Sequence, residues 1–320
     1  MSRDLLKDLD WDDPHTYALN KLYTLYRSEM SLTGNLTDIG YEGFPDPRFE
    51  KADGHSLTPD FLSIGAGGDA QIIDVKGFEN IEEYSEDREE AEDKIEATIK
   101  GLKKYSEVTN GMVADYLDRW DITAEPDYHE LVVLVPIEVY EDYTDTIETA
   151  STSENIRVWV LDDNSAEHIW LAQGPHRNDE LHRELQLNDG TGLTVYEGGK
   201  DLIQFTRDTD RDVVKFYFVA NMMTYCAHEG KQTFAFDEID RILTMEQKPP
   251  MFGHLPPGER EEMWIDCMNS MLDRFELVSR RDTVRDEYKW EKTRFLDQPR
   301  DRFKILEDVG DDLGVISEVE

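Results

Sequence analysis

The run "ELVVLVPI" at residues 130–137 is the feature that most limits what this chain can fold into. It is a continuous apolar stretch, which is typical of a strand that is covered on both faces. Such strands occur in sheets that have helices packed on either side. The run therefore predicts an α/β protein with a central sheet between layers of helices.

The neighbouring segments alternate between helical and strand patterns, as that architecture requires. Asp13 is a candidate N-cap and Pro14 a first helical residue, and apolar residues then recur at helical spacing as far as Met30. Strands are predicted at 59–64, 70–75, 130–137 and 156–162, and helices at 86–106 and 138–150. We expect a first domain of mixed α/β layers over residues 1–206.

The composition changes after about residue 207. "DVVKFYFVANMMTYCA" is apolar nearly all round and predicts a buried helix. The short strand "KQTFAF", two helices and a β-hairpin that turns near Asp282 and Thr283 follow. This is the element order of a winged helix-turn-helix. We expect such a domain at 207–320, ending in an acidic C-terminal tail.

The charge balance is strongly acidic, with 34 Lys and Arg against 72 Asp and Glu and a net charge of −38. Frequent apolar runs and 10% aromatic residues favour a packed protein over a disordered one. Acidity of this kind suits high salt, where charge repulsion is screened within about 3 Å at 1 M. The balance resembles that of halophilic, haloarchaeal cytoplasmic proteins, so we expect a cytoplasmic protein.

Two further features limit the cellular context. No apolar run reaches the length of a membrane span, so no membrane partner is expected. Cys226 and Cys267 lie in helix-like apolar segments and form no CxxC motif, which predicts two buried thiols in a reducing compartment.

The stretch "TPDFLSIGAGGDAQIIDVKG" at residues 58–77 places charge on two apolar strands. Residues two apart on a strand share a face, so Asp74 and Lys76 project together. If the strand beginning at Asp60 pairs alongside, its carboxylate reaches the same surface. Two carboxylates suffice for Mg²⁺ or Mn²⁺, because such cations keep several waters. The lysine could position the attacking water and offset phosphate charge.

These residues resemble the PD-(D/E)xK nuclease superfamily, which includes restriction endonucleases, Holliday-junction resolvases and repair nucleases. The matching positions are Pro59 and Asp60, followed by Asp74, Val75 and Lys76. The resemblance covers roughly residues 14–162. It implies a restriction endonuclease-like mixed central sheet flanked by helices, with Asp60 and Asp74 as metal ligands and Lys76 as the catalytic lysine.

The resemblance also implies a glutamate on the helix that precedes the strands. Glu29 fits, because its spacing from the apolar positions puts it on the inward face of its helix, as a third metal ligand and catalytic residue. Glu42 is the alternative for that role. One branch of the superfamily has Gln-apolar-x-x-Tyr on the next helix. The segment "GLKKY" keeps Tyr105 but has Gly101 in place of the glutamine.

The alternative interpretation of Asp74 and Lys76 is a solvated strand face with an edge ion pair, since this chain contains other acid-x-Lys triplets. The context favours a site. Only this triplet lies on an apolar strand 14 residues beyond a Pro-Asp strand start.

Positive charge gathers towards the C-terminus, where residues 274–304 hold ten Lys and Arg against seven Asp and Glu, a local net charge of +3. Phosphate contacts need such charge. We expect DNA contacts from Arg280, Arg281, Arg285 and Lys289 on the hairpin, and few from the preceding helix, which begins "GEREE". Alternatively, these arginines pair with neighbouring acids.

Together these features predict a Mg²⁺- or Mn²⁺-dependent DNA endonuclease placed on DNA by a winged helix. A homodimer is left open and would suit cutting of both strands. The alternative is a catalytically inactive nuclease-fold protein that binds DNA, regulates, or acts as a scaffold in a defence or mobile-element system.

Overall fold

The computed structural model describes residues 14–26, 35–78, 88–118, 122, 126–162, 168–186, 192–195, 205–207, 209–246, 251–282 and 286–315. The chain forms two compact units, one spanning Asp13–Gly198 and the other containing Gly199–Glu320. Within the described ranges, every helix falls short of the length and apolar content that a bilayer crossing requires.

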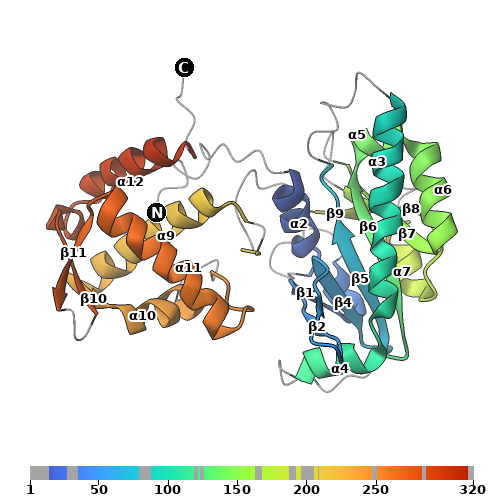
Figure 1. Ribbon diagram of the computed structural model, residues 1–320, viewed down its shortest axis with the longest axis horizontal. Helices are drawn as coiled ribbons and strands as arrows, with labels where there is room; N and C mark the ends of the chain where they lie inside the picture. The colour runs from blue at the N-terminus through green and yellow to red at the C-terminus, as the bar shows by residue number, and fades with distance from the viewer. Residues whose placement is uncertain are drawn as a thin grey trace. The chain divides into compact units, whose positions relative to one another are not determined.

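The first unit is built on a mixed seven-stranded sheet with the order β1-β4-β5-β6-β7-β8-β9 (Figure 1). Its strands are β1 (Tyr41–Pro45), β4 (Phe61–Gly65), β5 (Asp69–Val75), β6 (Tyr128–Pro136), β7 (Ile156–Asp162), β8 (His168–Gln173) and β9 (Leu193–Thr194). Strands β5, β6 and β7 are parallel, and the other neighbours are antiparallel. The strands β2 (Phe49–Glu50) and β3 (Ser56–Leu57) pair separately.

Helices cover both faces of this sheet, which confirms the predicted α/β layers. They are α2 (Pro14–Thr24), η1 (Leu36–Ile39), α3 (Arg88–Gly101), η3 (Leu102–Glu107), α4 (Asn110–Asp118), α5 (Ile137–Asp142), α6 (Thr144–Glu154) and α7 (Asp179–Glu184). Figure 1 shows α3 and α6 side by side across one face, where Ile95 and Ile147 join the same core cluster as Ile72. On the other face, Leu22 of α2 and Leu181 of α7 share a second cluster.

The run at 130–137 explains this layering. It forms β6 at the centre of the sheet, and its side chains alternate between the two core clusters. Val133 and Val135 belong to the cluster under α3, and Val132 and Leu134 to the cluster under α2. All four are at most 1% exposed. The predicted strands at 59–64, 70–75 and 156–162 are likewise confirmed as β4, β5 and β7, and the helical stretch at 138–150 divides into α5 and α6.

Gly43 on β1 is a position where a side chain would disturb this packing. A Cβ there would lie 2.5 Å from Phe61 Cζ and 2.6 Å from Tyr26 Cγ. We expect Gly43→Ala to lower the free energy of unfolding by about 1–3 kcal/mol, as overpacking does. Gly101 is the matched control. It has helical dihedral angles and nothing within 4 Å of an added Cβ, so Gly101→Ala should stabilise by about 0.5–1 kcal/mol. Urea unfolding in high KCl measures both, and equal effects of the two variants would contradict this packing.

The second unit combines helices with a small antiparallel sheet of order β10-β12-β11. Its elements are α9 (Arg211–Glu229), β10 (Thr233–Ala235), α10 (Phe236–Arg241), η4 (Ile242–Glu246), α11 (Pro257–Asn269), η5 (Ser270–Arg274), β11 (Val278–Asp282), β12 (Glu287–Trp290), η6 (Thr293–Leu296) and α12 (Pro299–Leu313). The segments η4 and η5 are π-helical turns that end α10 and α11.

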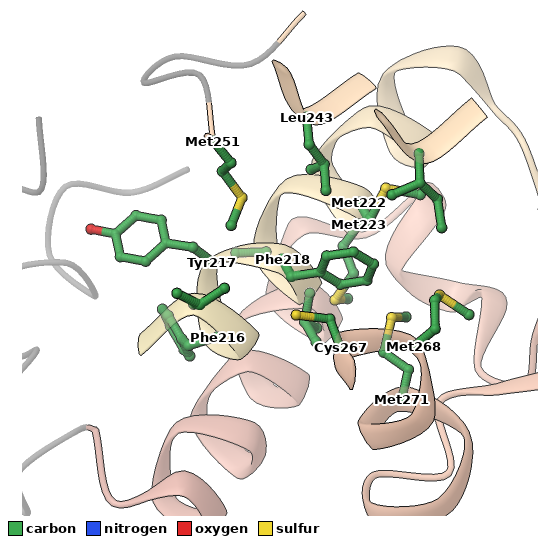
Figure 2. Close-up of a cluster of buried hydrophobic side chains, with 14 of the residues drawn as sticks. Phe216, Tyr217, Phe218, Met222, Met223, Leu243, Met251, Cys267, Met268 and Met271 are labelled. Atoms are coloured by element: carbon green, nitrogen blue, oxygen red, sulfur yellow. The ribbon is translucent and has the colours of Figure 1, made fainter. Parts of the chain in front are cut away.

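Helix α9 lies at the centre of this unit's core, which confirms the predicted buried helix. Figure 2 shows Phe216 and Phe218 of α9 packed among methionines that include Met251 and Met268. The two cysteines are free and buried in the same core, as predicted.

The acidic C-terminal tail expected from the sequence stays a prediction, because residues 316–320 lie outside the described residues. Before them, Pro299–Leu313 form helix α12, which packs against α9. Ile305, Leu306, Val309 and Leu313 are buried on one side of this helix. Acidic residues fill the positions between them, so composition concealed a helical apolar stripe.

Candidate active site

Asp60 and Asp74 come to the same place through the pairing of β4 with β5. Leu62 pairs with Ile72, and both belong to the core cluster beneath α3. The strands are antiparallel and Phe61 pairs with Ile73. Continuing this register by one residue places Asp60, just before β4, opposite Asp74 on β5. The register therefore puts both carboxylates at the end of the sheet, on the face that α3 covers.

Asp60 is held by a backbone donor and by a histidine. The Val75 N–H donates to Asp60 Oδ2 at 2.6 Å. Val75 is fully buried, so the carboxylate satisfies a donor that is costly to leave unpaired. His15, in the first turn of α2, places Nε2 at 3.4 Å from the same oxygen. The Asp60 side chain is still 12% exposed, which leaves it in contact with solvent.

Asp74 is buried and forms an ion pair with Lys76, its neighbour on the same face. The Lys76 side chain is 29% exposed, so its ammonium links the buried carboxylate to solvent. Tyr105 of η3 also interacts with Asp74, and its hydroxyl donates to the Thr58 carbonyl at 3.0 Å. A phenol has one proton to donate, so Asp74 and the carbonyl compete for it.

The electrostatics of the pair centre on Asp74. Burial raises the pKa of its carboxyl, and the charge of Asp60 raises it further. Lys76 and Tyr105 oppose these effects without cancelling them. Keeping a buried carboxylate beside a second carboxylate costs free energy. Such an arrangement is typical of a site that takes up a cation.

The other residues predicted for this site are placed differently. Glu29 lies outside the described residues. Glu42 is exposed on β1, opposite Ile64 of β4, and thus several residues along the sheet from Asp60. Gly101 ends α3 at an exposed position with open space around it. Within the described ranges, no three His, Cys, Asp or Glu residues gather as a metal-binding group. Of the predicted residues that the structure describes, Asp60, Asp74 and Lys76 lie together, with Tyr105 beside Asp74.

His15 is the member of the cluster that the sequence did not indicate. Its one local signal is its place immediately after Pro14, in the first helical turn. Which strand meets the start of that helix is a property of the folded chain, so spacing alone could not have joined His15 to Asp60.

Comparisons with known proteins give no relative: no family model matches the chain, no curated protein matches it, and no solved structure matches its fold. What the site can do is therefore inferred from its own residues and their geometry.

A second polar cluster lies on the other face of the sheet, around Glu130 of β6. Arg157 pairs with Glu130 Oε1 at 2.9 Å, and His176 Nδ1 lies 2.6 Å from Oε2. The Trp159 indole N–H donates to His176 Nε2 at 2.9 Å. Because an indole can only donate, Nε2 is the acceptor and Nδ1 bears the proton given to Glu130. The Glu130 and His176 side chains are at most 1% exposed, so this cluster is sealed from substrate.

Asp69 extends the polar layer along the start of β5. It accepts hydrogen bonds from Tyr41, from Gln71 Nε2 at 3.0 Å and from Asn178 Nδ2 at 3.1 Å. These bonds tie β1, β5 and the segment before α7 together. We assign both groups a structural role, since every charged member has protein partners and little contact with water.

The predicted DNA-contacting cations occupy the hairpin of the second unit. Arg280 on β11 and Lys289 on β12 are exposed. Arg281 lies 3.4 Å from Glu287, which is the alternative pairing that the sequence left open. Arg285 lies outside the described residues.

Proposed function

We propose that the first unit is a metal-dependent deoxyribonuclease that hydrolyses phosphodiester bonds. The observation that supports this most is the meeting of Asp60, Asp74 and Lys76 on one face of the sheet, in the order and strand context of the PD-(D/E)xK nucleases. The mixed sheet with helices on both faces supports a restriction endonuclease-like fold.

Asp60 and Asp74 would hold Mg²⁺ or Mn²⁺, with Glu29 proposed as the third ligand. Two carboxylates fit Mg²⁺, which is usually bound through one or two of them and keeps several waters. Burial and then the charge of Asp60 raise the pKa of Asp74, and both effects favour a cation beside this carboxylate. When bound, the metal would acidify a water and neutralise charge on the phosphodiester.

The remaining side chains have roles that follow from their contacts. Lys76 holds Asp74 on one side and is open to solvent on the other, where its ammonium can orient a water or a phosphate oxygen. Tyr105 and His15 are positioning residues, because each contacts one of the two carboxylates. Pre-positioned ligands lose less entropy when a cation and substrate arrive.

The second unit would place the enzyme on DNA. Its helix, strand, two helices and hairpin, with a sheet of order β10-β12-β11, support a winged helix. Arg280 and Lys289 on the hairpin are proposed contacts, together with Arg281 and Arg285.

Substitutions of Asp60 test the metal site. We expect wild-type protein to bind Mn²⁺ by calorimetric titration, and both Asp60→Ala and Asp60→Asn to lose that binding. Asparagine keeps an oxygen that can accept from Val75, so Asp60→Asn should remain close to wild type in thermal stability without metal, whereas Asp60→Ala should lose about 1–3 kcal/mol through the unsatisfied donor. At 100 times its Kd, Mn²⁺ should stabilise wild type by about 2.7 kcal/mol. Mn²⁺ binding by Asp60→Asn at wild-type affinity would refute the site.

One observation favours the alternative of a non-catalytic nuclease-fold protein that binds DNA. Both carboxylates already have partners, namely Val75 and His15 for Asp60, and Lys76 for Asp74. On that alternative, wild-type protein in molar KCl would bind DNA yet neither cleave it nor take up Mn²⁺. A scaffold role would instead appear as a protein partner that survives nuclease treatment of the lysate.

A further inference from the structure

Unpaired cations gather in one segment of the second unit. Elsewhere in this unit Arg207, Lys215, Lys231, Arg260 and Arg274 each form an ion pair with a carboxylate. By contrast, seven cations within residues 280–304 form no ion pair with any residue that the structure describes: Arg280, Lys289, Lys292, Arg294, Arg300, Arg302 and Lys304. All except Arg302 are exposed. Outside that segment, Arg211 at the start of α9 is likewise without an ion pair among the described residues.

This pattern is unexpected in a chain with 72 acidic residues against 34 Lys and Arg. An exposed cation on such a surface has many carboxylates available to it. Unpaired cations in one stretch therefore indicate a surface whose counter-charge comes from another molecule.

Three of these cations line one hollow. Lys292 and Arg294 follow β12, and Lys304 lies on α12. The hollow has a volume of about 510 Å³ and is also lined by Thr293, whose hydroxyl can donate to a phosphate, and by the buried Phe295. Glu291, Asp301 and Asp308 also line the hollow. Their negative charges lower the affinity of the hollow for an anion.

Helix α11 shows the opposite character. Glu261, Glu262 and Asp266 lie along it, and its one cation, Arg260, is occupied by Asp240 at 2.7 Å. A helix with this charge is repelled by the phosphates that border a DNA groove. The third helix of the unit is therefore a poor candidate for entry into a groove.

We propose that the segment Lys289–Lys304, comprising the end of the hairpin, η6 and the first turns of α12, binds the phosphate backbone of DNA, and that α11 does not contact it. The proposal rests on the proposed DNA-cleaving function and extends it, because it names the surface that grips the substrate. Backbone contacts give affinity without reading bases, so binding by this surface should depend strongly on salt and little on sequence.

The test is the salt dependence of DNA binding, measured by fluorescence anisotropy of a labelled duplex with the full chain in EDTA across a range of KCl. Each phosphate contact contributes about 0.9 to the slope of log K against log salt. The triple variant Lys292→Gln, Arg294→Gln and Lys304→Gln should therefore bind with a slope shallower by about 2.7. Cleavage plays no part in this measurement, so failure of the nuclease proposal would leave its result unchanged.

Two further variants distinguish the loss of DNA contacts at this surface from general effects of charge or folding. The control triple Arg207→Gln, Lys215→Gln and Lys231→Gln makes the same charge change at paired cations and should keep the wild-type slope. Asp301→Asn with Asp308→Asn should tighten DNA binding, a gain that misfolding cannot produce.

Several results would overturn the proposal. One is an equal loss of slope in both triple variants, and another is a wild-type slope in the triple variant of Lys292, Arg294 and Lys304. The others are a wild-type protein that does not bind DNA, and displacement of DNA by polyglutamate at the same charge concentration. The last would assign the surface to an acidic protein.

Discussion

Asp74→Asn should abolish DNA cleavage and at the same time make the protein more stable at neutral pH. The loss of activity follows because the variant keeps the shape of the side chain and removes the charge that would hold the metal. A metal bound at the proposed site would contribute several kcal/mol of transition-state stabilisation, so we expect cleavage to fall by about 10³-fold or more.

The gain in stability follows from the direction of the Asp74 pKa. Burial, and then the charge of Asp60, raise the pKa of this carboxyl in the folded protein. A raised pKa means that the folded state holds the proton more tightly than the unfolded chain does. The favourable contribution of Asp74 to the free energy of unfolding is fully present below the pKa that this carboxyl has in the unfolded chain. It is lost as pH rises through the pKa that the carboxyl has in the folded protein. Ionising Asp74 therefore costs more free energy in the folded protein than in the unfolded chain, and asparagine removes that cost.

Cleavage of plasmid in molar KCl with Mg²⁺, together with thermal unfolding without metal, measures both effects. Glu92→Gln is the matched control, because it removes the same charge from another acid-x-Lys triplet, on the exposed side of α3. We expect the control to keep wild-type cleavage. Wild-type cleavage by Asp74→Asn would remove the basis of the nuclease proposal, and a loss of stability in that variant would show that the Lys76 ion pair outweighs burial.

The sequence predicted the elements whose patterns are local. The apolar run of β6 reports its surroundings directly, since a strand that is buried on both faces tolerates few polar residues. Asp60 and Asp74 could be joined because they lie on consecutive strands, where a short turn favours antiparallel pairing.

What the sequence could not predict depends on contacts between distant segments. His15 reaches Asp60 only because α2 packs beneath the sheet. The helical stripe of α12 was hidden by acidic residues at the intervening positions. The cluster around Glu130 was missed because a single charged residue at the start of an apolar run looks like a strand end, and its partners Arg157 and His176 come from two later segments.

Breaking that cluster should produce the largest loss of stability in the first unit. Glu130→Ala leaves Arg157 and His176 without the carboxylate that satisfies them, in a place that has little contact with water. Removal of one partner from a buried ion pair costs about 3–5 kcal/mol. We expect that loss in urea unfolding monitored by circular dichroism, whereas Glu138→Ala, on the exposed side of α5, should stay within about 0.5 kcal/mol of wild type.

The same cluster gives a pH dependence of known sign. Burial by itself would raise the pKa of Glu130, but the hydrogen bond from His176, the charge of Arg157 and the Arg177 backbone N–H outweigh it, and the pKa lies below its ordinary value. The contribution of the ionised carboxylate is therefore present above the unfolded pKa of a glutamate and is lost as pH falls through the lowered folded pKa.

Glu130→Gln separates this contribution from packing, because it preserves volume and removes the charge. Its free energy of unfolding should lie below that of wild type at neutral pH, and the two should converge as acid protonates Glu130 in the wild-type protein. If the difference in free energy of unfolding between the two proteins stays constant from neutral to acidic pH, Glu130 acts through its shape and not through its charge. The ion pair with Arg157 would then be no part of what holds β6 and β7 together.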